Sequence, residues 1–173
     1  EDYPFRDYQI SKLKPKDRKI ALSRKDVRKI EEFDLEHYSH LTDARHFFVF
    51  SYYARGMNMV DMMLLKWTDI RNNRFSYIRS KTGKRQTVEV LPPMQDILDY
   101  YKNHFPQTNY IFPYLLHEDL TEKQIQYRKQ KVLKQINAGL KEIGKVLNIG
   151  GKLTTYVARH SFATNLKYAG IST

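Results

Sequence analysis

The stretch from Thr42 to Ala54 limits the possible folds more than any other. It contains the nearly unbroken apolar run Phe47-Phe48-Val49-Phe50-Ser51-Tyr52-Tyr53-Ala54, and Thr42 or Asp43 can begin a helix there. A helix that is apolar on almost every side must lie in the middle of a core. We therefore expect a helix over residues 42–54 that other helices surround.

The segments on either side of this helix have their own helix signals. Ser23 with Asp26, and Asn58 with Asp61, each predict an N-cap followed by an acidic third residue. Thr121 with Gln124 is typical of a capping box that opens a long helix. Residues at spacings of three and four predict the buried stripe of that long helix: Leu133, Ile136, Leu140, Ile143 and Leu147.

Two further helices complete the helical part. One is expected from about Met94 to Asn103, after Pro92-Pro93. The other opens at a threonine after Leu153 and closes near Gly170, a usual stop residue. Its apolar stripe is predicted to be Ala158, Phe162 and Leu166.

Between Asp69 and Leu91 the pattern alternates with a period of two, as in strands. Asn72-Asn73 and Thr82-Gly83-Lys84 are turn signals, and they bound expected strands over residues 75–79 and 87–91. The predicted fold class is thus mainly α with a small antiparallel β-sheet (α+β) of two or three strands. Arg55 lies at the corner that ends the buried helix, where a structural salt bridge and a functional role both stay open.

The charge of the chain indicates its partner. The formal net charge is +11 and the sequence pI is about 9.7, which in a folded domain favours a nucleic-acid partner over an anionic membrane. The 173 residues suffice for one domain and include no cysteine, so disulfides and thiolate metal sites are excluded. No apolar run suits a membrane span or a signal peptide, so we expect a cytoplasmic protein without a membrane partner.

Several chemistries have no matching motif. The sequence contains no glycine-rich phosphate loop, no Gly-x-Ser-x-Gly elbow and no paired acids suited to magnesium. His37 and His40 lack the further ligands of a zinc site. The remaining candidates are three cations, for which we expect no metal and no small-molecule cofactor: Arg55, Lys81 on the predicted hairpin, and Arg159 on the last helix.

These cations lie in blocks that resemble the tyrosine recombinases, or phage-type integrases. The blocks are Ala54-Arg55-Gly56-Met57-Asn58 followed by Asp61 and Leu64-Leu65, then Ser80-Lys81-Thr82-Gly83, and then Ala158-Arg159-His160-Ser161-Phe162-Ala163-Thr164. Their order and spacing are similar to those of the family's catalytic domain, in particular in integrases of mobile elements from Bacteroides-like bacteria. Residues 21–173 would be that domain, and residues 1–20 a basic linker from a missing N-terminal core-binding domain.

The resemblance implies a site-specific DNA recombinase that cleaves and rejoins double-stranded DNA without metal, through a 3′-phosphotyrosyl intermediate. Arg55 and Arg159 match the family's arginines that hold the scissile phosphate, and Lys81 matches the lysine that protonates the leaving 5′-hydroxyl. A pair of planar guanidinium groups suits phosphate oxygens as charge develops on them. Lysine can act as a general acid when nearby cations lower its pKa.

The sequence departs from the family pattern in two ways. Tyr156 stands where the family often has histidine or lysine; we place it in the site with an open role, because a phenol is a poor base at neutral pH. His160 matches a structural histidine of the family. The family's later histidine block and nucleophilic tyrosine do not follow Arg159, so we expect a fold truncated at its C-terminus and an inactive fragment.

Two rival hypotheses keep the basic surface without the chemistry. One is a non-catalytic DNA-binding module, and the other is an interaction domain whose three cations are salt-bridged. Family members act as tetramers on DNA, so the intact protein is expected to assemble with itself. One feature separates the recombinase from both rivals. A recombinase site needs Arg55, Lys81 and Arg159 around one open basic pocket.

Overall fold

The computed structural model describes residues 20–115 and 119–170. The predicted basic arm lies outside these residues except for Ile20. The described elements, in chain order, are α1 (Arg24–Glu31), η2 (Ser39–Leu41), α2 (Thr42–Tyr53), α3 (Met59–Leu64), η3 (Trp67–Asp69), β1 (Ile70–Arg71), β2 (Arg74–Ile78), β3 (Arg85–Glu89), α4 (Pro92–His104), α5 (Glu122–Val146) and α6 (Thr155–Tyr168). Within the described ranges, no helix has both the length and the apolar character that a membrane crossing needs.

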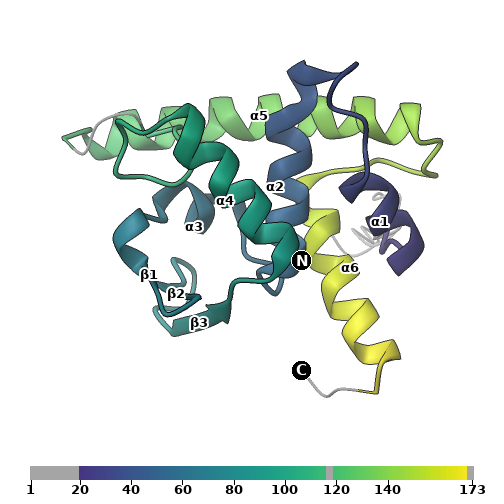
Figure 1. Cartoon of the computed structure of the whole chain (residues 1–173), viewed down its shortest axis with the longest axis horizontal. Coiled ribbons are helices and arrows are strands. Elements are labelled where there is room, and N and C mark those ends of the chain that lie inside the picture. The colour runs from purple at the N-terminus through teal and green to yellow at the C-terminus, as the bar shows by residue number, and fades with distance from the viewer. Residues whose placement is uncertain (1–19, 116–118, 171–173) are drawn as a thin grey trace, which may run out of the picture.

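Helix α2 is the centre of the core, as its sequence predicts. It contacts α1, α4, α5 and α6, and Figure 1 shows α5 crossing one end of it. Phe47, Phe48 and Phe50 are each no more than 1% exposed. Helix α5 approaches closely because Gly139 has no side chain: a Cβ there would lie 2.7 Å from the Cβ of Ala44.

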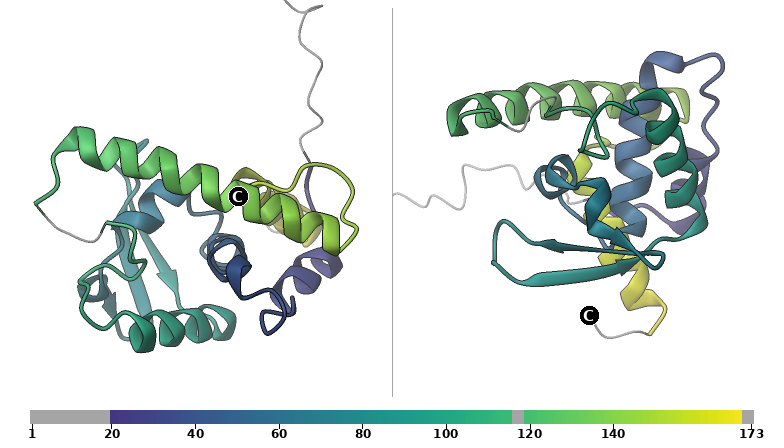
Figure 2. Two further views of the ribbon diagram at one scale, coloured as in Figure 1. Left: turned by 90° about the horizontal axis from the view of Figure 1, so that it is seen from above. Right: turned by 60° about the vertical axis from the view of Figure 1, so that its left-hand side comes forward.

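The small sheet lies to one side of α2 and has the antiparallel order β1-β2-β3 (Figure 2). Asn72 and Asn73 join β1 to β2 with φ angles of 49° and 58°, a left-handed pair that asparagine tolerates. Phe75 on β2 pairs with Val88 on β3, and both side chains are buried. Phe75 stacks on Phe50 of α2, which fastens the sheet to the helical core.

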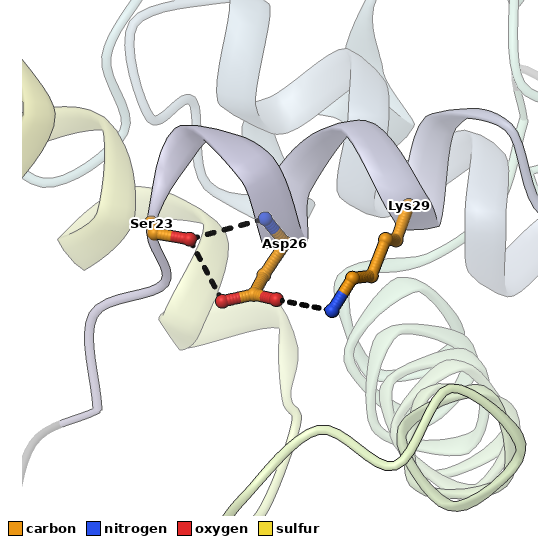
Figure 3. A network of polar contacts seen from close by, with 3 residues as sticks. All are labelled: Ser23, Asp26 and Lys29. Carbon is orange, nitrogen blue, oxygen red and sulfur yellow. Dashed lines mark hydrogen bonds and ion pairs between the residues drawn. The ribbon is translucent and has the colours of Figure 1, made fainter.

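The predicted helix starts are confirmed by their capping contacts. The Ser23 hydroxyl accepts the Asp26 amide at 3.1 Å and donates to the Asp26 carboxylate at 2.8 Å, as Figure 3 shows. Lys29 then pairs with Asp26 at 2.9 Å, and this ion pair and the Ser23 hydrogen bond lower the pKa of Asp26. The capping box of Thr121 and Gln124 also forms. Local polar signals therefore fix where these helices begin.

Two predicted apolar stripes differ from the structure. On α5, Val132 is buried whereas Leu133 is 39% exposed. On α6, the fully buried face includes Ser161 and Asn165, while Phe162 is only partly buried. The reason on α6 is the segment before α1: Ser161 accepts the Leu22 amide at 2.8 Å, and Asn165 donates to the Leu22 carbonyl at 3.2 Å. The buried backbone of Leu22 needs polar partners, which an apolar helix face could not supply.

Buried His46 makes the stability of the fold depend on pH. Its ring lies edge-on to Tyr100 and Tyr101, and burial, followed by the charges of Arg45 and His104, lowers its pKa to about 3. The unfolded chain then binds one more proton between pH 6.5 and 3, so the free energy of unfolding falls as the pH falls through this window.

We expect a loss of about 2 kcal/mol between pH 7 and pH 4.5 from this one group. Urea unfolding at both pH values measures it. The variant His46→Gln should lose about 2 kcal/mol less than the unsubstituted chain over the same change. An equal loss in both proteins would mean that other groups cause the acid sensitivity.

Candidate active site

Arg55 occupies a backbone position that usually belongs to glycine. Helix α2 ends at Tyr53, Ala54 is its C-cap, and Arg55 follows with a φ of 57°. The Gly56 amide donates to the Ser51 carbonyl at 2.8 Å, which closes a Schellman motif with Arg55 at its left-handed position. Arg55, and not the neighbouring Gly56, therefore occupies the left-handed position that glycine usually takes at the end of a helix. The exposed Arg55 side chain projects from a strained corner, a feature that clusters at functional sites.

Gly56 joins this corner to the helix that carries Arg159. Its φ is 72°, and a Cβ built on it would lie 2.8 Å from Cγ and 3.1 Å from Cα of Arg159. Only glycine allows the backbone of residue 56 to lie so close to α6. Arg55 and Arg159, 104 positions apart in the sequence, are thus attached to two backbones in direct contact.

Asp61 fixes the hairpin that carries Lys81. This carboxylate is 3% exposed, and its Oδ1 accepts hydrogen bonds from both the amide, at 3.0 Å, and the hydroxyl of Ser80. Its other oxygen accepts from Asn58 at 2.8 Å. Lys81 follows Ser80 directly, and the turn is closed by bonds from Thr82 and Gly83 to the Arg79 carbonyl. The base of the hairpin is therefore bound to α3, which begins just after Arg55-Gly56.

Removing the Asp61 carboxylate should release this hairpin. We expect Asp61→Ala to lower the free energy of unfolding by about 2–3 kcal/mol, since the buried partners lose their acceptor. Amide hydrogen exchange at Ser80 measures the local effect and should become much faster. Asp69→Ala is the control, because the Asp69 carboxylate accepts the Lys66 amide away from the turn. Continued protection of the Ser80 amide would contradict the proposed anchoring.

A groove of about 430 Å³ lies between the hairpin and the start of α6. We call it the Lys81 groove; it is lined by Asn58, Met59, Val60, Ser80, Lys81, Leu133 and Thr155. Thr155 is one helical turn before Arg159, and its amide donates to Asn137 of α5 at 2.9 Å. The exposure of Leu133 has its explanation here, since the side chain forms part of the groove wall.

The three predicted cations are not neutralised by acids. Across residues 20–115 and 119–170, the ion pairs are Lys29–Asp26, His37–Asp34 and His40–Glu142, so none contains Arg55, Lys81 or Arg159. The hypothesis of salt-bridged structural cations therefore has no supporting pair in the described chain. In the same residues, no group of three His, Asp or Glu side chains could hold a metal ion.

Tyr156 lies on α6 but does not line the Lys81 groove. It is 56% exposed, and its ring meets the ring of His160 edge-on with centroids 4.2 Å apart. Nε2 of His160 is buried without a hydrogen-bond partner among the described residues. The structure thus pairs these two aromatic side chains one turn apart, and a role for Tyr156 in the site stays a prediction.

Sequence reasoning missed three supporting residues: Asp61 as the hairpin anchor, Asn137 as the partner of α6, and Leu133 as a groove wall. The sequence indicates Asp61 as a capping partner of Asn58 and as part of the first family-like block, but not as a partner of the hairpin. Its bond to Ser80 joins residues 19 positions apart, which no local pattern can reveal. One feature of the sequence indicates that Leu133 can be exposed. The neighbouring residue, Val132, is also apolar and can take its place in the buried stripe.

The sequence comparison decides the family. Residues 16–173 match the model of the phage integrase family. The chain belongs to the phage integrase family. A search of curated proteins with this sequence found no match.

Solved structures of recombinases have the same fold as this phage integrase domain. XerA recombinase aligns with a TM-score of 0.60 at 18% identity, over 88% of this chain and 52% of that chain. A lambda integrase (75-356) dimer bound to a COC' core site aligns at 0.59 and 17%, over 91% and 56%. The lambda integrase catalytic core aligns at 0.58 and 18%, over 86% and 84%.

These alignments confirm the predicted fold, mainly helical with a small antiparallel sheet. This phage integrase domain spans about half the length of the XerA and DNA-bound lambda integrase chains. At identities below 20%, these alignments show a shared fold alone. The activity has to be argued from the residues of this chain.

Proposed function

We propose that this chain is the catalytic domain of a site-specific tyrosine recombinase, which cleaves and rejoins DNA strands without a metal through a 3′-phosphotyrosyl intermediate. The observation that carries the proposal is the packing of Gly56 on Arg159, which joins the Arg55 corner to α6. The Lys81 groove then reaches the first turn of the same helix. Neither Arg55 nor Arg159 lines that groove, so the convergence of the three cations on one phosphate is inferred from these two contacts.

In the proposed reaction, Arg55 and Arg159 hold the non-bridging oxygens of the scissile phosphate. Their guanidinium groups stay charged and offset the charge that builds up on phosphorus-bound oxygen, the task of metal ions in other phosphoryl transferases. A tyrosine oxygen attacks phosphorus, the bond to the 5′-oxygen breaks, and Lys81 gives that oxygen its proton. Tyr156 is proposed to hydrogen-bond near the phosphate. We assign no nucleophile among the 173 residues.

The surface of α5 supports a duplex as the substrate. Seven exposed residues repeat at spacings of three and four and form one stripe without an acid: Lys123, Tyr127, Gln130, Lys134, Ala138, Lys141 and Lys145. Over 22 residues the stripe is about 33 Å long, close to one turn of B-DNA. It adjoins Leu133 and Asn137, which face the Lys81 groove and α6.

Three finer parts of the proposal have less direct support. Action in the cytoplasm is expected from the sequence features given above, and self-assembly into a tetramer on DNA follows from the family resemblance. The origin in a mobile element of Bacteroides-like bacteria does so too. Each stays a prediction.

A covalent-trapping experiment tests the function. The full-length protein is incubated with a nicked suicide duplex, and the protein–DNA adduct is measured on a denaturing gel. We expect an adduct with the unsubstituted protein and a loss of about a thousandfold in its rate of formation with Arg159→Ala. Arg159→Lys should recover little, because an ammonium group lacks the planar fork.

The alternative of a non-catalytic DNA-binding module predicts another result. The full-length protein would then bind the duplex without forming an adduct, and Arg159→Ala would only weaken binding. Lys141→Gln on the α5 stripe is a useful comparison. It should weaken DNA binding while leaving the rate of adduct formation at saturating protein unchanged.

A further inference from the structure

A second group of cations lies on the sheet, apart from the Lys81 groove. Alternate residues of a strand project from the same face, and the cross-strand pairs of one face here are Arg71–Arg74, Arg74–Glu89, Ser76–Thr87 and Ile78–Arg85. The opposite face carries Phe75 and Val88 and is buried in the core. We call the first the outer sheet face; its three arginines are exposed.

The outer sheet face borders a cavity of about 720 Å³ that α3 and η3 close on the other side. Arg71, Arg74 and Arg85 all line this cavity, together with the hydroxyl groups of Ser76 and Thr87. Ser76 and Thr87 hydrogen-bond to each other at 2.9 Å. The sheet side of the cavity therefore offers two hydroxyl groups together with the three arginines.

Among the described residues, the acids near this cavity form no ion pair with its three arginines. Asp61 is occupied by Ser80 and Asn58, and Asp69 accepts the Lys66 amide at 2.8 Å. Glu89 lies opposite Arg74 in the register, yet no ion pair forms between them. In the described chain none of the three arginines forms an ion pair. The carboxylates of Asp61 and Asp69 also line the cavity, so its three arginines outnumber two acids.

We propose that the outer sheet face binds the sugar–phosphate backbone of the same DNA duplex, beyond the phosphate at Lys81. This rests on the proposed function, which places the scissile phosphate at the hairpin. Arg85 pairs with Ile78 at the hairpin end, whereas Arg71 and Arg74 lie at the other end of the strands. Five strand residues cover about 17 Å, which is about five base pairs of duplex.

The chemistry favours a phosphate backbone over a base-reading contact. Guanidinium groups bind phosphate oxygens with two parallel hydrogen bonds, and phosphate contacts position a protein on DNA without reading its sequence. The broad cavity between α3 and the sheet holds no aromatic ring other than partly buried Tyr77. Burial, followed by the nearby Asp61 charge, raises the pKa of the Tyr77 phenol, which therefore stays neutral.

The salt dependence of DNA binding tests the proposal on this 173-residue chain. Binding to a fluorescent duplex of about 30 base pairs is measured at several salt concentrations, for the unsubstituted chain and for the triple variant Arg71→Gln, Arg74→Gln, Arg85→Gln. Three lost phosphate contacts should reduce the slope of log affinity against log salt by about 2–3. Melting curves check that the exposed substitutions leave the fold intact.

The matched control removes the same charge elsewhere. Arg24, Lys25 and Arg28 are exposed on α1, which Figure 1 shows across α2 from the sheet. Their triple glutamine variant should change the slope by less than about 1. An unchanged slope in the sheet variant would overturn the proposal. An equal drop in both variants would also overturn it, because net charge alone would then explain the effect.

Duplex length tests the position of the contact. The affinity of the unsubstituted chain should keep rising until the duplex covers the outer sheet face, and that of the sheet variant should level off about five base pairs earlier. Identical length profiles would overturn the proposal. The adduct assay separates this result from the function: without any adduct the recombinase proposal fails, while the slope and length profiles still report whether the sheet binds DNA.

Discussion

Replacing Arg55 with glycine is expected to stabilise the fold and abolish the chemistry. A left-handed residue with a side chain costs about 1–2 kcal/mol, and glycine at that position avoids this cost while losing about 0.5–1 kcal/mol through its freer unfolded chain. Arg55 has a φ of 57°, so Arg55→Gly should raise the free energy of unfolding by about 0.5–1 kcal/mol. Adduct formation by the full-length protein should fall by about a thousandfold, because one phosphate ligand is lost.

Two comparisons separate strain from chemistry. Asn148 is at the corresponding left-handed position after α5, with a φ of 51°, so Asn148→Gly relieves the smaller strain of an asparagine, away from the Lys81 groove. It should keep full adduct formation. Arg55→Ala removes the guanidinium group and keeps the strain, so it should lose activity without gaining stability. Denaturant unfolding and the adduct assay measure both quantities. Lower stability in Arg55→Gly would mean that Arg55 makes native contacts that outweigh its backbone strain.

This corner also shows how far the sequence predicts the site. The order of helices follows from local signals, such as the Ser23 cap and the apolar run of α2, because capping and periodicity act within a few residues. The position of Arg55 at the end of α2 leaves its role open, and its family-like sequence block makes it a candidate. Its left-handed conformation could not be read from the sequence, because Gly56 beside it is the residue that ordinarily takes that role.

The contacts that position the backbones of the candidate residues depend on packing between distant segments. The Asp61–Ser80 bond and the Gly56–Arg159 contact each need two segments that meet only in the folded chain. The same holds for α6, whose buried face the apolar pattern misassigned. Ser161 and Asn165 are buried because the backbone of Leu22 needs hydrogen bonds there, and that backbone comes from the other end of the chain. Local patterns thus predict elements, while side-chain convergence requires tertiary structure.

Substituting Gly56 should be among the most damaging single changes in the chain. In Gly56→Ala the new Cβ would lie 2.8 Å from Cγ and 3.1 Å from Cα of Arg159, so the backbone of α6 must shift. The φ of 72° adds the left-handed penalty, and together we expect a loss of about 2–4 kcal/mol in the free energy of unfolding. Because Arg159 itself is displaced, adduct formation by the folded variant should fall by about a hundredfold or more.

Gly83→Ala is the matched control for this prediction. Gly83 has a similar φ of 65°, but a Cβ built there meets nothing within 4 Å. It therefore carries the backbone penalty alone, about 1–2 kcal/mol. The difference between the two variants in denaturant unfolding measures the contact with Arg159. Equal losses would show that α6 moves away from the new methyl group at little cost. The close approach of the two backbones would then not be what holds Arg55 and Arg159 together.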